Sequence, residues 1–315
     1  MTTYKGIKGF SIQTVAGDPS NNIAGQMWYN SSARKIKAFK SGAGNWSTGG
    51  NTNTRHSYGA GLGTQTAGLS AGGYSPPRTA DSEEYNGTAW TEGSNLNQAR
   101  SSMRGCGTQT AGLTAGGYKA PVSADSEEYN GTSWTAGNAL GTARYNLGGG
   151  GTQTAGLVSG GYIPGSNDSA LVEEYNGTSW SEVNNVPSAR YGIALTGTQG
   201  AMLSHSENTE VLYYDGTNWT EGTNTPASID TGGNAGTQTA AFVWANAASQ
   251  TWNGTAWTTV NNMSTSRKEN QAATAGTTTS TMASGGEKPS GSPNLALDTE
   301  EWDDPFDETV TFTSS

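Results

Sequence analysis

Short runs that alternate small, apolar and polar residues recur along the chain, separated by glycine-rich turns. In one copy, residues 100–106 lead to the turn GTQT, residues 111–118 read AGLTAGGY, and residues 126–130 read SEEYN before a last run at 132–137. The Asn-Gly pair between the last two runs predicts a tight hairpin, because both central residues of such a turn need positive φ. The copy therefore predicts four short antiparallel strands and no helix.

The same unit recurs along most of the chain. The string GTQT, or a drifted form of it, begins at positions 63, 107, 151, 197, 236 and 276, with spacings of 44, 44, 46, 39 and 40 residues. A tryptophan follows the same rule, at Trp46, Trp90, Trp134, Trp180, Trp219 and Trp257. Between them lies an acidic and aromatic motif, which carries Tyr85, Tyr129 and Tyr175 in three copies. Four strands at a period of ~40–50 residues predict a propeller blade.

The two ends of the repeat complement each other. Trp46 precedes the first complete unit, whereas the last unit begins near Arg267 and reaches TEEW at 299–302 without a clear fourth-strand sequence after it. We expect the segment around Trp46 to supply that strand, which would remove the free sheet edges. The prediction is an all-β, six-bladed β-propeller over residues 46–302, closed by pairing of the N- and C-terminal segments. Residues 1–45 would form an arm and β-hairpin leader, and residues 303–315 an acidic tail.

The composition indicates how such a ring is filled. The chain has 10 Trp and 13 Tyr, and these repeated aromatic residues are the expected core, since each buries ~150–250 Å². Glycines at 59–61 and 148–151 suit the crowded axis. An arginine also recurs, at Arg55, Arg100, Arg144, Arg190 and Arg267. We expect one glutamate of each SEEY-like motif to bond the arginine that opens the next unit.

Several functional classes find no support in the residues. The net charge of −10 argues against a nucleic-acid-binding face, and no apolar run approaches the ~20 residues of a membrane span. His56 and His205 lack nearby His or Cys partners, and Cys106 fits a small buried residue better than a nucleophile. No nucleophile-elbow or P-loop motif occurs. We therefore expect no enzyme activity, cofactor or metal site.

At these residues the chain resembles kelch repeats: a Gly-Gly pair closes strand two, an aromatic residue lies in strand three, and a tryptophan lies in strand four. The GTQTAGL, GGY and EEYNGTSW strings are similar to those of kelch-like proteins of marine bacteriophages. Residues 17–46 look like a GQxWYN hairpin of phage virion proteins. The resemblance implies a structural protein displayed on the virus particle, on its tail or capsid, and it carries over no catalytic residue.

The two faces of the expected disc differ in their sequence. The GTQT and NGT turns, which would share one face, are nearly constant, whereas the loops between strands two and three vary. Binding residues concentrate in variable loops on a rigid scaffold, although such loops also drift without function. The candidate binding residues on this variable face are Pro76, Pro77, Arg78, Lys119, Pro121, Ile163, Pro164, Lys288 and Pro289.

Two functions follow from this interpretation. In the first, residues 1–45 attach the propeller to other virion proteins, and the variable face binds a host-surface glycan or protein. In the second, the ring is purely architectural, as a capsid decoration or a tail or neck joining protein. A glycan-cleaving propeller enzyme is a third class. It would need acids and aromatic residues that converge in one pocket, and no unit departs from the repeat to supply them.

Overall fold

The computed structural model describes residues 13–17, 27–40, 44–206, 208–229, 232–272, 275–289, 294–304 and 308–312. Within these ranges every regular element is a β-strand and none is a helix. The described part accordingly has no helix long and apolar enough to cross a membrane. The chain divides into two units: a terminal unit, which joins Met1–Gly44 with Asp304–Ser315, and a repeat domain, Asn45–Asp303.

The terminal unit contains one four-stranded sheet. Its strands, in sheet order, are β1 (Gln13–Val15), β2 (Met27–Asn30), β3 (Lys35–Lys40) and β30 (Glu308–Phe312). β2 and β3 form an antiparallel hairpin, β1 runs parallel to β2, and β30 runs antiparallel to β3. The sequence predicted a leader separate from a C-terminal tail, whereas in the structure a strand of that tail joins the sheet of the leader. Most of the predicted arm lies outside the described residues.

The repeat domain contains six four-stranded antiparallel sheets, numbered here in chain order. Sheet 1 contains β5 (Ala60–Thr64), β6 (Ala67–Tyr74), β7 (Arg78–Tyr85) and β8 (Trp90–Glu92). Sheet 2 contains β9 (Arg104–Thr108), β10 (Ala111–Ala115), β11 (Ser126–Tyr129) and β12 (Trp134–Ala136). Sheet 3 contains β13 (Gly148–Thr152), β14 (Ala155–Ser159), β17 (Val172–Tyr175) and β18 (Trp180–Val183). A small hairpin of β15 (Tyr162–Ile163) and β16 (Asn167–Asp168) projects from sheet 3.

The remaining three sheets follow the same plan. Sheet 4 contains β19 (Ala194–Thr198), β20 (Ala201–His205), β21 (Val211–Tyr214) and β22 (Trp219–Glu221). Sheet 5 contains β23 (Gly233–Thr237), β24 (Ala240–Ala245), β25 (Ala248–Trp252) and β26 (Trp257–Val260). Sheet 6 contains β27 (Gln271–Ala272), β28 (Ser280–Ser284), β29 (Thr299–Asp303) and β4 (Asn45–Thr48). The fourth strand of sheet 6 therefore comes from the start of the domain, with Trp46 opposite Trp302.

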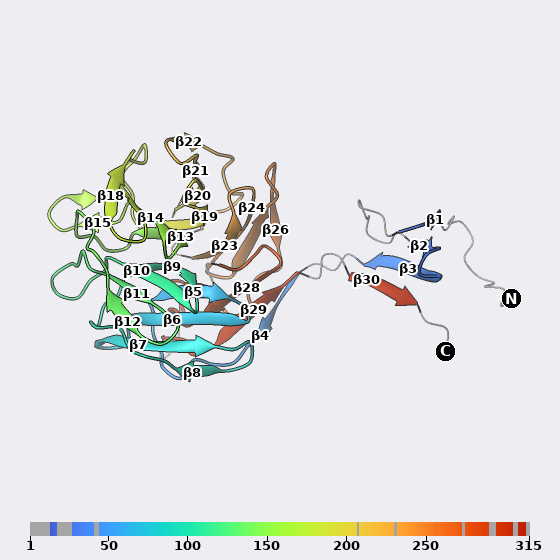
Figure 1. The fold of residues 1–315 in the computed structure, drawn as a ribbon, viewed down its shortest axis with the longest axis horizontal. Helices are drawn as coiled ribbons and strands as arrows, with labels where there is room; N and C mark the ends of the chain where they lie inside the picture. Colours follow the sequence, from blue (N-terminus) through green and yellow to red (C-terminus); the bar gives the residue numbers. More distant parts are fainter. Residues whose placement is uncertain are drawn as a thin grey trace. The chain divides into compact units, whose positions relative to one another are not determined.

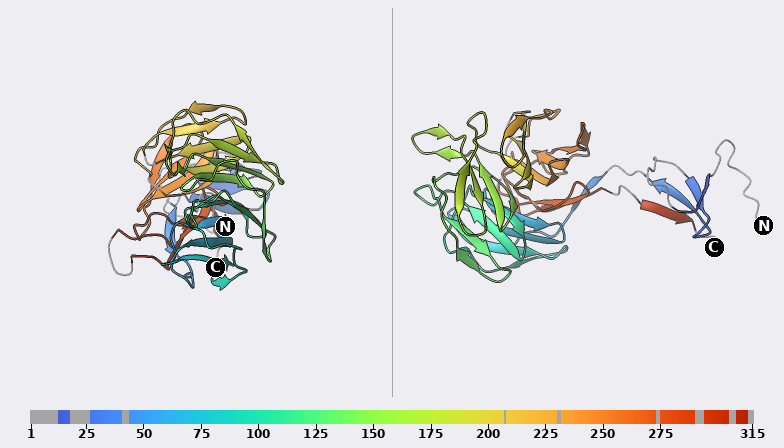
Figure 2. Two further views of the ribbon diagram at one scale, coloured as in Figure 1. Left: turned by 90° about the vertical axis from the view of Figure 1, so that its left-hand side faces the viewer. Right: turned by 45° about the horizontal axis from the view of Figure 1, so that its top comes forward.

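The sheets are arranged side by side through their first strands. Each first strand contacts the first strand of the next sheet, and β27 of sheet 6 contacts β5 of sheet 1. These strands gather toward the middle of the domain, and the later strands of each sheet lie further out (Figures 1 and 2). Small residues are required at the middle: a Cβ added to Gly148 would lie 2.9 Å from a methyl carbon of Ile193 in the next sheet.

Aromatic pairs fill the space between neighbouring sheets. The third-strand tyrosine and fourth-strand tryptophan stack in a tilted arrangement, for example Tyr129 and Trp134 with ring centroids 4.9 Å apart. Trp134 then reaches the preceding sheet, where its Nε1 donates a hydrogen bond to Ser82 Oγ at 3.1 Å. The predicted core residues are buried in the described structure, except that Trp180 and Trp257 are half-buried. They are Trp46, Trp90, Trp134, Trp219, Tyr85, Tyr129 and Tyr175.

Two polar contacts repeat from sheet to sheet and explain the constancy of the motifs. The glutamine of GTQT donates to two main-chain carbonyls of the preceding sheet; Gln153 Nε2 lies 3.1 Å from Gly112 O and 2.8 Å from Tyr129 O. The third-strand tyrosine donates to the second glutamate of the preceding EEY motif, and Tyr129 Oη lies 2.5 Å from Glu84 Oε1. The repeated glutamine and tyrosine therefore bind the sheets to one another.

Candidate functional site

The connections between second and third strands lie at the end of each sheet where the chain arrives from the preceding sheet. Backbone bridges between the lead-in segment and the residues that follow the second strand fix this arrangement, as in Ser101 with Tyr118 and Tyr145 with Tyr162. We call this end the loop face. Its described residues are 75–77, 116–125, 160–171, 206, 208–210, 246–247, 285–289 and 294–298.

Buried arginines hold the ends of the long connections together. Arg100 Nη1 donates to Gly116 O and to Asp125 O, both at 2.8 Å, and these carbonyls lie at the two ends of connection 116–125. Its Nη2 forms an ion pair of 2.8 Å with Glu127, and the arginine side chain is fully buried. Burial lowers the pKa of Arg100, and the Glu127 carboxylate opposes that shift.

Arg144 and Arg267 repeat this arrangement. Arg144 donates to Gly160 O and Leu171 O and pairs with Glu173, and Arg267 donates to the carbonyls of residues 285 and 298 and pairs with Glu300. The predicted arginine–glutamate contact therefore exists, but its register was wrong. Each arginine binds the glutamate of its own sheet, because the arginine turns toward the strands that follow it.

The pattern of arginines was also wrong at two positions. Arg55 is exposed, and the place of Arg100 is taken in sheet 1 by His56, whose Nε2 lies 2.7 Å from Ser70 Oγ. Arg190 forms a 3.0 Å ion pair with Glu210, since leucine occupies the strand position of the missing glutamate in sheet 4.

The structure places eight of the nine candidate binding residues on the loop face, and the ninth, Arg78, is the first residue of β7 next to it. The prolines are exposed, whereas Arg78, Lys119, Ile163 and Lys288 are half-buried. The cations already have partners: Lys119 contacts Gln98 Oε1 at 2.6 Å and also Asp125, and Lys288 Nζ lies 2.9 Å from Asp298 Oδ1. The exposed prolines are Pro76, Pro77, Pro121, Pro164 and Pro289.

The lysines stabilise the ionised form of the carboxylates that they contact. Hydrogen bonds from Lys119 and Ser123 outweigh burial and lower the pKa of Asp125. The same balance lowers the pKa of Asp298, where Lys288 and Arg267 supply the positive charge. The carboxylates of Asp125 and Asp298, at the ends of their loops, are therefore ionised well below neutral pH.

A row of one arginine and three tyrosine side chains crosses the loop-face end of sheets 1 to 3. The guanidinium carbon of Arg78 lies 4.2 Å from the ring centroid of Tyr118. Tyr118 and Tyr145 meet edge to face at 5.8 Å, and Tyr145 and Tyr162 are tilted at 5.2 Å. All four side chains are half-buried. We call them the tyrosine row, and only Arg78 among them was predicted as a binding residue.

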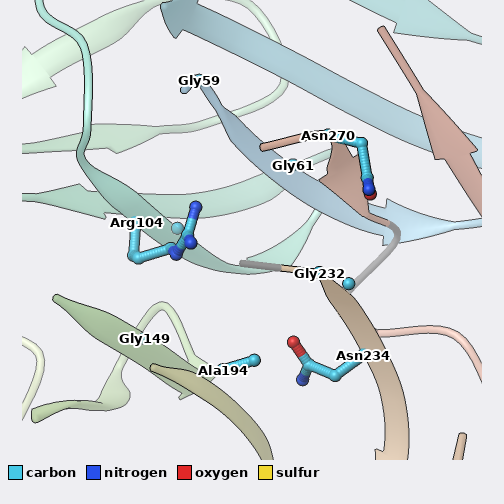
Figure 3. A pocket seen from close by; sticks show the side chains of 10 residues that line it. Gly59, Gly61, Arg104, Gly149, Ala194, Gly232, Asn234 and Asn270 are labelled. Atoms are coloured by element: carbon cyan, nitrogen blue, oxygen red, sulfur yellow. The ribbon is translucent and has the colours of Figure 1, made fainter. Parts of the chain in front are cut away.

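A second hollow, which we call the axial pocket, lies between the first strands (Figure 3). Its lining comes from all six sheets, and its empty volume of about 340 Å³ includes space open to solvent. Glycines form most of the wall, as predicted for residues 59–61 and 148–151. The lining residues are Gly59, Gly61, Arg104, Gly105, Gly149, Ala194, Gly232, Gly233, Asn234 and Asn270.

The polar residues of the axial pocket were not among the residues predicted from the sequence. Arg104 is the first residue of β9, where the first strands of sheets 1, 3, 4 and 5 begin with Ala60, Gly148, Ala194 and Gly233. This replacement was visible in the aligned units as one charge among small residues.

The histidine His205 and the cysteine Cys106 are buried. His205 is almost fully buried, and its pKa is lowered to about 4 by burial and by the positive charge of Arg104. Burial raises the pKa of the Cys106 thiol to about 12. Among the described residues, no group of three or more His, Cys, Asp or Glu side chains is placed to hold a metal ion.

Comparison with known proteins identifies the type of fold but matches no protein family. No protein-family model and no curated protein matches the chain. The solved structure of YjhT is similar, with a TM-score of 0.66 at 12% sequence identity over 84% of this chain and 99% of that chain. At this identity the likeness shows the fold alone, which is all-β and β-propeller-like.

Proposed function

We propose that this protein is a non-enzymatic structural protein of a bacteriophage particle, displayed on the tail or capsid, whose loop face binds a host-surface glycan or protein. The observation that carries the binding role is the tyrosine row. Tyr118 and Tyr162 of this row belong to the variable connections, on a scaffold whose repeated motifs bind sheet to sheet. The virion location follows from the sequence resemblance described above.

We further propose that the six sheets are the blades of a closed, six-bladed, kelch-like propeller. The support is the pairing of β4 with β29 and the aromatic cluster around it. Trp46 lies 5.4 Å from Trp244 of sheet 5 and 5.7 Å from Trp302, ring centroid to centroid, and its Nε1 donates to Ser249 Oγ at 3.0 Å. If this contact closes the ring, Trp46→Ala costs ~3–5 kcal/mol of unfolding free energy. A change below about 0.5 kcal/mol, the usual range for surface substitutions, would contradict closure.

The tyrosine row suits recognition on physical grounds. Tyrosine offers a large, rigid contact area with few rotatable bonds, so its side chain loses little conformational entropy on binding. A ring also presents an apolar face and a polar hydroxyl to one ligand. The contacts between neighbouring rings preorganise the row, which lowers the cost of binding further.

The test uses the full chain and two matched variants. Tyr118→Ser with Tyr145→Ser removes the centre of the row, and Thr88→Ala with Thr132→Ala changes two exposed threonines of the NGT turns, on the face opposite the loops. Binding of labelled protein to host cells should fall at least about tenfold in the first variant, since central aromatic contacts each contribute ~2 kcal/mol or more, and should not change in the second. Equal binding by both variants would reject the loop face as the binding surface.

The architectural alternative rests on a separate observation. The first and last segments share the sheet of the terminal unit, which gives the chain a second folded element with which to contact other virion proteins. If the ring only joins subunits, the loop face is covered in the particle. A cysteine in place of exposed Gly165 distinguishes the two roles: maleimide labelling in intact particles indicates adhesion, and protection there with labelling of the free protein indicates architecture.

A further inference from the structure

The axial pocket collects three polar residues that depart from the repeat. Arg104 begins β9, where most other sheets have alanine or glycine. Asn234 is the second residue of β23, at the position of Gly61, Gly105 and Gly149. Asn270 follows a residue with positive φ, as Gly59 and Met103 do in their own sheets. Three independent departures in sheets 2, 5 and 6 therefore meet in one hollow (Figure 3).

The hydrogen bonds of the two asparagines orient their remaining groups. Trp244 Nε1 donates to Asn270 Oδ1 at 3.3 Å, and an indole N–H can only donate. The amide nitrogen of Asn270 therefore has no partner among the described residues, although the residue is 4% exposed. Asn234 Nδ2 donates to Leu195 O, which leaves its Oδ1 as an acceptor on the pocket side (Figure 3).

Arg104 differs from the buried arginines of the lead-in segments. Arg100, Arg144 and Arg267 each have a glutamate partner at 2.8 Å. Within the described part of the chain no carboxylate lies within 4.0 Å of Arg104, and its guanidinium extends into the axial pocket (Figure 3). A partly buried cation without a counter-ion favours an anion beside it, because burial weakens its hydration.

We infer that the axial pocket binds a small carboxylate that carries a hydroxyl next to the carboxylate group. The planar guanidinium of Arg104 matches a carboxylate in a two-bond geometry, and Asn270 Nδ2 supplies a third donor. Asn234 Oδ1 would accept the ligand's hydroxyl proton. The side chains that line the pocket leave little free space between them, which excludes a larger ligand. The inference does not depend on the proposed virion role.

Isothermal titration calorimetry of the full-length protein tests this site with sodium lactate, which has the adjacent hydroxyl, and sodium acetate, which lacks it. Sodium chloride at matched ionic strength measures the contribution of bulk charge. Wild-type protein should bind lactate more tightly than acetate, with no heat from chloride. No binding of lactate or acetate would overturn the inference.

Two variants restore the residue types of the other sheets and should fold. Arg104→Ala, as in Ala60 and Ala194, should weaken both carboxylates at least about tenfold, the value of one charged hydrogen bond. Asn234→Gly should remove the preference for lactate and leave acetate unchanged. Arg55→Ala, which removes an exposed cation, is the control. Equal affinities in Arg104→Ala and wild type, or a retained lactate preference in Asn234→Gly, would contradict the assignment.

Discussion

The buried arginine of sheet 2 offers a quantitative test of how the loop face is held. Arg100→Met keeps most of the side-chain length but removes hydrogen bonds to Gly116, Asp125 and Thr114 and the ion pair with Glu127. The Glu127 carboxylate then stays buried without its cation, which costs ~3–5 kcal/mol. With about 2.1 cal/mol/K of unfolding entropy per residue over roughly 260 residues, the Tm should fall by about 6–9 °C. Differential scanning calorimetry and urea unfolding measure both quantities.

The controls separate the buried pair from a general loss of charge. Arg55→Met removes an exposed arginine and should change stability by less than about 0.5 kcal/mol. The double variant Arg100→Met with Glu127→Gln imitates sheet 5, where Gln250 occupies the glutamate position and is 1% exposed. The double variant should be more stable than the sum of the single losses by about 2 kcal/mol or more. Additive losses, or an unfolding free energy that Arg100→Met leaves unchanged, would refute the role of the Arg100–Glu127 pair in holding the ends of connection 116–125.

Three further predictions address the joints between sheets and the turns. Gln153→Ala removes two hydrogen bonds to the preceding sheet and should lower the unfolding free energy by about 1–3 kcal/mol; an unchanged urea midpoint would contradict the role of GTQT. Gly72→Ala places a Cβ 2.4 Å from Met103 Cε at φ +59°, whereas Gly165, at φ +82°, has nothing within 4 Å. Gly165→Ala should therefore cost only the ~1–2 kcal/mol of left-handed backbone, and Gly72→Ala clearly more; equal losses would disprove the clash. Burial and a hydrogen bond to a neighbouring glutamate raise the pKa of Tyr85 to about 12. Since this is above its ordinary value of 10, the contribution of Tyr85 is complete below pH 10 and is lost between pH 10 and 12. Tyr85→Phe should flatten the fall of stability in that window, and an unaltered pH profile would count against it.

The sequence was sufficient to predict the β class and the propeller-like architecture because the turns of most sheets have recognisable sequence motifs. The Asn-Gly and Gly-Thr-Gln strings need backbone conformations or contacts that few other residues provide. The glutamate partner of each arginine could not be predicted in this way. In a periodic chain, a bond from Arg100 to Glu127 and one from Arg100 to Glu83 repeat equally well. Only the direction in which the side chain leaves the lead-in segment decides between them.

The axial pocket was beyond prediction for a related reason. Arg104, Asn234 and Asn270 lie in different units, and the period places each beside the axis without showing which of them face one another. Each could have been noticed as a departure from its aligned position. Their convergence depends on how the sheets are arranged around one another and on the tilt of their first strands, which no local pattern encodes. The tyrosine row was missed similarly, because Tyr145 comes from a lead-in segment, whereas Tyr118 and Tyr162 come from the connections that follow second strands.

The distribution of the arginine–glutamate pairs indicates what they do. The three pairs with a fully buried arginine occur in sheets 2, 3 and 6, and each of these sheets has a long connection between its second and third strands. Sheets 4 and 5 have short connections after His205 and Ala245 and lack the pair in this form. In sheet 1 the stretch between Ala71 and Ser82 is as long as that between Ala115 and Ser126 of sheet 2, but β6 and β7 continue to pair along it, and His56 takes the place of the arginine. A long loop loses more conformational entropy when its ends are brought together, and the arginine bonds the carbonyls at both ends. A buried ion pair is also weak evidence for stability in itself. We therefore regard the pair as the device that fixes a long loop on an otherwise constant sheet, so that the loop sequence can change while its two ends remain in place.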